Sequence, residues 1–166
     1  MEELNNQGII IIRNPFMALV SHRHLDAGGH IGFAPEAHFE GEGWRSFVLL
    51  KIKLWKEFYM DWINNSKRGD LCVIFYEDLT SDVLNTLKKV LNFLSLPVDN
   101  RRLQCIAKYP RADLKRKKVK IPKSDPFTQE LQSKIYEAID ELNQTLVTKL
   151  NIYMPLSQYK NTLNQY

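Results

Sequence analysis

The sequence is poor in cysteine and in long apolar runs, and each shortage excludes a class of protein. Its two cysteines, Cys72 and Cys105, form no C-x-x-C or other metal-ligand spacing. We predict two buried thiols, with a disulfide between them left open. No apolar run approaches the ~20 residues that cross a bilayer. The start, MEELNNQG, has no basic flank followed by an apolar stretch, so no secretory leader is visible.

A strong charge of either sign is also lacking. The formal net charge is +4 and the pI about 9.0, which suits an anionic ligand such as a nucleotide but falls short of a nucleic-acid-binding surface. The 166 residues are 44% hydrophobic and 25% charged, without repeats or low-complexity segments. These values are typical of one soluble globular domain with a buried core.

The pattern of the first part of the chain predicts a strand, a tight turn and a helix. The β-branched run at residues 9–12 predicts a strand covered on both faces, as in parallel sheets. Asn14 and Pro15 then provide an N-cap and a proline at the first helical position. The helix that they open is expected to end at the glycines at 28 and 29.

Residues 28–43 contain five glycines and predict a loop that forms a ligand wall or a lid. A long helix is expected from Trp44, because apolar residues follow at steps of four and three: Val48, Ile52, Trp55, Tyr59 and Trp62. We interpret this stripe as core. Trp44, at the start of the helix, is the one tryptophan left open for stacking on a sugar.

A second buried strand is predicted at residues 71–76, followed by a helix capped by Thr80 or Ser81 with its leucines at 84, 87, 91 and 94. Asp125 and Pro126 are expected to start the last helix, whose apolar stripe is Phe127, Leu131, Ile135, Ile139, Leu142, Leu146 and Leu150. The polar tail beyond Pro155 is predicted to be loose.

Two strands built for burial make a very small parallel sheet with unpaired edges. The seven residues ahead of Gly8 cannot supply a further strand with its crossover helix. We therefore expect a longer parent domain that begins upstream of Met1.

Arg13 lies directly after the first strand and before a helix N-terminus, where parallel α/β sheets collect anionic ligands. Its guanidinium can hold two phosphate oxygens, and the hydroxyl of Ser21 can add a further bond. This pair predicts a phosphate site. The alternative is structural, with Arg13 in a cap or ion pair and Ser21 facing solvent.

The motif Arg13-Asn14-Pro15-Phe16 followed by Ser21 resembles the 3′-phosphate-binding motif of sulfotransferases, which use 3′-phosphoadenosine 5′-phosphosulfate. Tyr76-Glu77-Asp78-Leu79 and the helix ending Phe93-Leu94-Ser95-Leu96-Pro97 resemble the family's later strand and helix. Residues 27–34, the helix at 44–62 and the basic run leading to Asp125-Pro126-Phe127-Thr128 are similar to the WSC-domain-containing sulfotransferases, a Golgi-type group.

The resemblance implies an α/β fold with a P-loop-like parallel sheet between helices, here helix-rich and truncated at its N-terminus. It implies a partial sulfotransferase domain at residues 1–155 and a polar tail at 156–166. A Golgi membrane location on the lumenal side and a glycan acceptor are further family-based expectations. The membrane anchor would lie outside this chain.

Carried over residue by residue, the resemblance assigns the 3′-phosphate to Arg13 and Ser21 and places Tyr76 against the adenine. Lys115 and Arg116 begin the basic run that would lie over the nucleotide phosphates, and a purely solvated run is the equal alternative. No metal is expected, because His22 and His24 are two apart on a helix and point to different sides.

The sequence departs from the family in one respect. A Gly-containing loop with Lys and Ser or Thr, which would hold the phosphosulfate, does not occur before Gly8. The catalytic base is also unassigned, since His30 and His38 fit either an acceptor pocket or an ordinary polar loop.

Three hypotheses follow: a sulfotransferase, a truncated or inactive relative that only binds the nucleotide, and a basic interaction module.

Overall fold

The computed structural model describes residues 7–67, 69–108 and 122–160. The chain divides into two compact units. The first, here called the strand unit, consists of Met1–Arg13 and Ser66–Lys115, and the second, the helical unit, of Asn14–Asn65 and Arg116–Tyr166. Within the three described ranges, no helix has the length and apolarity to cross a bilayer.

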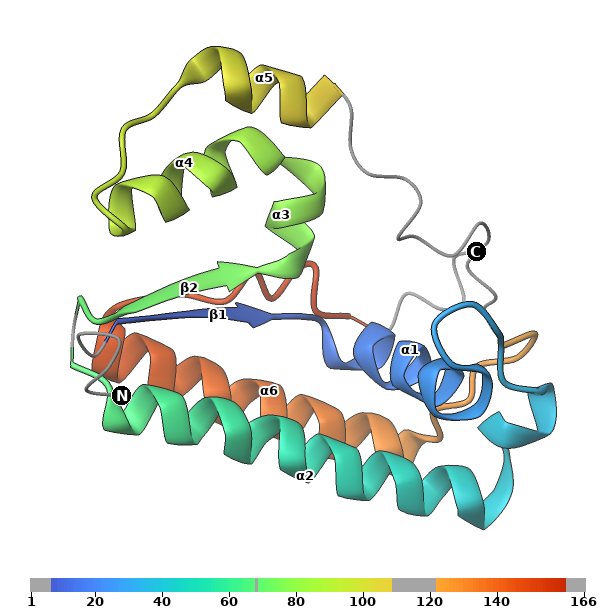
Figure 1. The fold of residues 1–166 in the computed structure, drawn as a ribbon. Coiled ribbons are helices and arrows are strands. Elements are labelled where there is room, and N and C mark those ends of the chain that lie inside the picture. The colour runs from blue at the N-terminus through green and yellow to red at the C-terminus, as the bar shows by residue number, and fades with distance from the viewer. Residues whose placement is uncertain (1–6, 68, 109–121, 161–166) are drawn as a thin grey trace. The chain divides into compact units, whose positions relative to one another are not determined.

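The strand unit contains a two-stranded parallel sheet of β1 (Gly8–Ile12) and β2 (Leu71–Phe75), which Figure 1 shows side by side. The register pairs Gly8 with Leu71 and Ile12 with Phe75, so both strands end at the same level. Every residue of β2 is buried, as predicted.

The prediction that β1 is covered on both faces is wrong. Ile10 and Ile12 are buried, whereas Ile9 is 41% and Ile11 is 45% exposed. Alternate residues of a strand point to opposite faces, and the described residues cover only one face of β1. A run of isoleucines cannot reveal this difference, because each position is equally apolar.

Three helices follow β2 in the strand unit: α3 (Tyr76–Ser81), α4 (Val83–Phe93) and α5 (Asn100–Lys108). The cap of α4 is Asp82, whose carboxylate accepts from Asn85 N, and not Thr80 or Ser81 as predicted. Those two hydroxyls instead donate to the carbonyls of Glu77 and Asp78 inside α3. They are therefore already used by the preceding helix.

The helical unit begins with α1 (Pro15–Gly28), and its predicted start and end are both confirmed. The side chain of Asn14 accepts from Phe16 N at 3.0 Å, and Pro15 occupies the first helical position. Gly29, at φ 61°, ends the helix in a conformation that side chains rarely adopt. The segment predicted to be a loop with little regular structure contains one short 3-10 helix, η2 (Glu36–Phe39).

Two long helices, α2 (Gly41–Asn65) and α6 (Gln129–Leu150), lie alongside each other and run in the same direction (Figure 1). Arg45 pairs with Glu130 and Lys56 with Glu141, both at 2.7 Å and both 85 residues apart in sequence. A constant separation is what two parallel helices require. The predicted stripe of α6 is buried at every position, from Phe127 to Leu150.

The boundaries of these helices differ from the prediction. The long helix α2 begins at Gly41, three residues before Trp44. The last helix is capped by Thr128, which accepts from Leu131 N, and not by Asp125. The Asp125 carboxylate instead accepts from Phe127 N and holds the turn ahead of the helix.

Trp44 is core and unsuited to sugar stacking. It is 2% exposed, its ring stacks on Phe47, and its indole nitrogen donates to the carbonyl of Pro126 at 2.8 Å. A buried indole needs such an acceptor. The tryptophans at 55 and 62, predicted as core, are only half-buried.

The prediction of a loose tail is wrong for residues 156–160. Tyr159 is 1% exposed, and the amide of Asn14 donates to the carbonyls of Gln158 and Lys160. One buried aromatic and two hydrogen bonds therefore fasten this segment. Residues 161–166 lie outside the described part.

Candidate nucleotide site

Arg13 and Tyr76 come from the two strands of the sheet and meet at one edge of it. Because Ile12 and Phe75 are register partners, the next residues, Arg13 and Tyr76, follow directly at the carboxyl ends of β1 and β2. The guanidinium carbon of Arg13 lies 4.5 Å from the centre of the Tyr76 ring. This distance is a cation–π contact, which orients the guanidinium.

Arg13 retains unused hydrogen-bonding capacity. The residue is half-buried, and its Nε atom is buried without a hydrogen-bond partner among the described residues. A buried guanidinium N–H without an acceptor is costly. An anion at this edge of the sheet would supply the missing acceptor, so the geometry of Arg13 fits a phosphate or sulfate group.

The roles of the other predicted ligand residues are not tested by the structure. Ser21 is half-buried on α1, in the helical unit, and its pairing with Arg13 stays a prediction. Lys115 and Arg116 lie outside the described residues, so their role over the phosphates also stays a prediction. Within the strand unit, the structure brings Arg13 and Tyr76 together.

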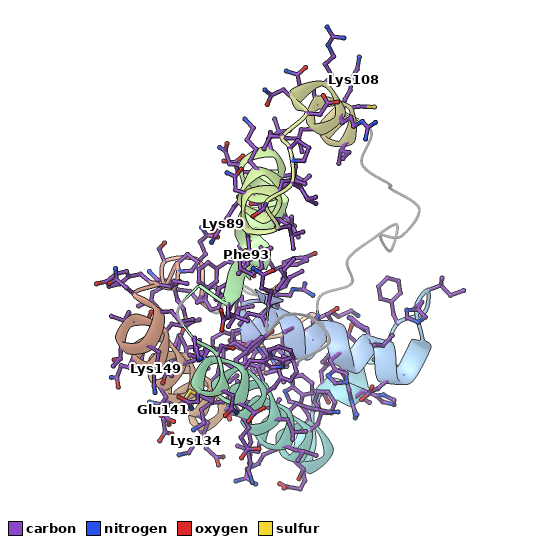
Figure 2. All side chains as sticks on the ribbon, turned by 60° about the vertical axis from the view of Figure 1, so that its left-hand side comes forward. Lys89, Phe93, Lys108, Lys134, Glu141 and Lys149 are labelled. Atoms are coloured by element: carbon purple, nitrogen blue, oxygen red, sulfur yellow. The ribbon has the colours of Figure 1, made fainter. Side chains whose placement is uncertain are left out.

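Lys89 is a residue of the strand unit that the sequence did not single out. It comes from α4, where Figure 2 labels it near Phe93, and its Nζ donates to the carbonyl of Val73 in β2 at 2.7 Å. This bond ties α4 to the strand that ends at Tyr76. A lysine on a helix after a strand gives no sequence signal for such a bond, because most lysines face solvent.

The cysteines of the strand unit are free thiols, and only one is buried as predicted. Cys72 lies in β2, where burial raises the pKa of its thiol against the smaller opposing effect of Lys89. Cys105 is exposed on α5, which corrects the prediction for that residue. Its apolar neighbour Ile106 is also exposed, at 52%, so apolar neighbours in sequence did not indicate burial.

The histidines of the helical unit have separate surroundings. His24 is buried and accepts from Ala34 N at 3.0 Å between the rings of Phe33 and Phe39. His22 lies 3.3 Å from Asp26. The described part of the chain contains no cluster of three side chains that could bind a metal ion.

The two candidates for the catalytic base also differ. His30 is exposed. His38 is half-buried, its carbonyl accepts from Arg23 Nε at 3.0 Å, and its Nδ1 atom is buried without a partner among the described residues. Neither environment assigns a base, so the choice between an acceptor pocket and a polar loop stays open.

A shallow hollow on α6 has the wrong charge for a nucleotide. It is lined by Ser133, Tyr136, Glu137, Asp140, Glu141 and Gln144. Figure 2 labels Glu141 on this helix, between Lys134 and Lys149. Two of its three carboxylates, Glu137 and Glu141, are paired with lysines, and no residue that lines the hollow is cationic. A hollow without a cation is a poor phosphate site, so the sheet edge is the better candidate.

The family model described as "Sulfotransferase domain" matches residues 1–149. The chain belongs to the sulfotransferase family. This match confirms the resemblance to sulfotransferases that the sequence predicted.

Among curated relatives, a WSCD family member of Aedes aegypti is 31% identical over 84% of this chain and 44% of its own length. A WSCD family member of Drosophila melanogaster is 29% identical over 78% and 41%. Sulfotransferase 2A6 of Rattus norvegicus is 25% identical over 61% and 36%. The chain thus spans less than half the length of the curated relatives that it matches.

The solved structure of a mouse sulfotransferase, SULT7A1 complexed with PAP, matches with a TM-score of 0.54 and 23% identity. The match covers 84% of this chain and 58% of that one. It shows the fold: helix-rich α/β with a small parallel sheet, as predicted.

Proposed function

We propose that this chain recognises the nucleotide of 3′-phosphoadenosine 5′-phosphosulfate in a sulfotransferase that sulfates a hydroxyl group, with a glycan as the acceptor. The observation that carries the proposal is the Arg13–Tyr76 contact at the carboxyl edge of the sheet, with Arg13 Nε buried and in need of an acceptor. The PAP bound to the mouse sulfotransferase of the same fold supports this choice of ligand.

Each residue has a role that follows from its chemistry. The guanidinium of Arg13 binds the 3′-phosphate through two N–H groups, and the hydroxyl of Ser21 donates a further bond. The ring of Tyr76, which lies beside Arg13 at the end of β2, packs against the adenine. Lys115 and Arg116 add positive charge over the phosphates.

Sulfate transfer also requires groups that stabilise charge on the leaving oxygen, as a loop of backbone N–H groups and a lysine does. We propose that the residues named above bind the nucleotide, while such a loop belongs to the whole sulfotransferase. We place the whole sulfotransferase in the Golgi membrane with this domain on the lumenal side, as its family suggests.

Isothermal titration calorimetry with adenosine 3′,5′-bisphosphate tests the nucleotide site. Loss of a charge-assisted bidentate contact in Arg13→Ala costs about 2 kcal/mol, or roughly thirtyfold in affinity. Arg13→Lys is expected to recover part of the affinity, because it restores the charge without the planar fork. Equal affinities of the wild type and Arg13→Ala would rule out the phosphate role.

Arg101→Ala is the matched control. This exposed arginine lies on α5 in the same unit, so its removal changes the net charge equally without touching the sheet edge. Its affinity is expected to equal that of the wild type. If both variants weaken binding equally, and if polyanions bind with strong salt dependence and no nucleotide preference, the basic interaction module is the better hypothesis.

A further inference from the structure

The sequence contains two Asn-x-Ser/Thr triplets, Asn64-Asn65-Ser66 and Asn143-Gln144-Thr145. Such triplets accept N-linked glycans in a secretory lumen. The triplets alone do not distinguish the two asparagines. Their places in the fold do, because one lies at the end of a helix and the other in the interior of a helix.

Asn143 is held inside α6 (Gln129–Leu150) and has a structural role. It is half-buried, and its Oδ1 atom accepts from Met154 N at 3.0 Å, which fastens the chain after the helix. The hydroxyl of Thr145 donates to the carbonyl of Glu141 at 2.9 Å. Residues two apart on a helix also point to different sides, so folded α6 cannot present both side chains together.

Asn64 has none of these constraints. It is exposed in the last turn of α2, which ends at Asn65, and Ser66 follows beyond the helix. The Asn64 side chain makes no hydrogen bond to another described residue, whereas Asn65 donates to the carbonyl and carboxylate of Asp61. Helix ends fray readily. Fraying of this last turn therefore breaks no side-chain hydrogen bond of Asn64 itself.

We infer that Asn64 is an N-glycosylation site and that Asn143 is not. The inference rests on the lumenal location proposed above. An oligosaccharide is transferred as one block from a lipid pyrophosphate donor. The amide nitrogen of Asn64 bonds to C1 of the first sugar, the bond from C1 to the pyrophosphate oxygen breaks, the nitrogen loses one proton, and the lipid pyrophosphate leaves.

The test is translation of the full chain behind a cleavable secretory leader in the presence of endoplasmic reticulum microsomes. The folded, protease-resistant fraction is then compared on a gel before and after treatment with peptide-N-glycosidase. We expect one glycan to shift the chain to lower gel mobility, and we expect the glycosidase to remove this single step. Asn64→Gln and Ser66→Ala abolish the step, and the matched Asn143→Gln and Thr145→Ala retain it.

A step that survives Asn64→Gln, or a wild-type chain without any step, overturns the inference. Thr145→Ala keeps the test interpretable if Asn143→Gln fails to fold, because it leaves the Asn143–Met154 bond in place. The microsomes supply the lumen, so the result does not depend on the natural location of the protein. Nucleotide binding is measured on unglycosylated protein, which separates failure of this inference from failure of the proposed function.

Discussion

The helical unit and the strand unit differ in how they bury apolar side chains. In the helical unit, α6 alone buries seven residues, and Ile135, Leu142 and Leu146 have no exposed surface. In the strand unit, burial is concentrated in the strands. The leucines of α4 at positions 84, 87 and 91 are half-buried, and Leu94, Leu96 and Ile106 are 40–52% exposed.

This difference separates stability from ligand chemistry. Buried apolar area is the main source of folding free energy, so we expect the paired helices α2 and α6 to be the more stable region. Arg13 and Tyr76, which carry the proposed nucleotide contact, belong to the strand unit. Sites of this kind commonly lie in regions of lower local stability.

The largest expected effect on stability distinguishes the two units when one leucine in each is replaced by alanine. Leu142 is fully buried on α6, and we expect Leu142→Ala to lower the free energy of unfolding by about 2–5 kcal/mol. Leu87→Ala removes the same atoms from the half-buried face of α4 and is expected to cost about 1 kcal/mol. Urea unfolding followed by circular dichroism measures both. Equal losses would show that the two units contribute alike.

A smaller effect is expected at Asn14, the first residue of the helical unit. Its Oδ1 caps α1 and its amide donates to the carbonyls of Gln158 and Lys160. Asn14→Ala removes all three bonds, and we expect a loss of about 2 kcal/mol in the free energy of unfolding.

The matched variant at this position is Asn14→Ser, whose hydroxyl oxygen can still cap α1 but which lacks the amide that donates to the two carbonyls. It should fall between the wild type and Asn14→Ala in urea midpoint, and proteases should cut residues 156–160 faster in both variants. If Asn14→Ser unfolds at the wild-type midpoint, the amide bonds to the tail contribute nothing.

Much of the fold could be predicted because its signals are local. The cap at Asn14, the proline after it and the stripe of α6 act through neighbours within one or two turns, and all three are confirmed. The exposed face of β1 and the buried Tyr159 depend on what lies across from them. Spacing along the sequence carries no information about such partners, so both predictions failed.

The candidate site could be predicted only in outline. The position of Arg13 after a strand indicates an anion site, because ligands collect at the carboxyl ends of parallel strands. Its contact with Tyr76 required the register of β1 against β2, which sets residues 63 positions apart side by side. Lys89 gave no signal at all, since its bond to Val73 depends on how α4 packs on the strand.

The smallest effect is expected at the surface of the helical unit, where Arg45 of α2 bonds to Glu130 of α6. The hydrogen bond from Arg45, with a smaller contribution from the charges of Arg45 and Lys134, holds the pKa of the Glu130 carboxyl below its usual value of 4.5. A carboxyl whose pKa is lowered by folding adds stability above its unfolded pKa and loses it as the pH falls.

Glu130→Gln removes this titration. Because the pair is exposed, the urea midpoint near neutral pH should scarcely move. The wild type should lose more stability than Glu130→Gln between about pH 5 and about pH 3, which flattens the pH profile of the variant. Identical slopes for the wild type and Glu130→Gln would mean that the α2–α6 contact depends on its buried face alone.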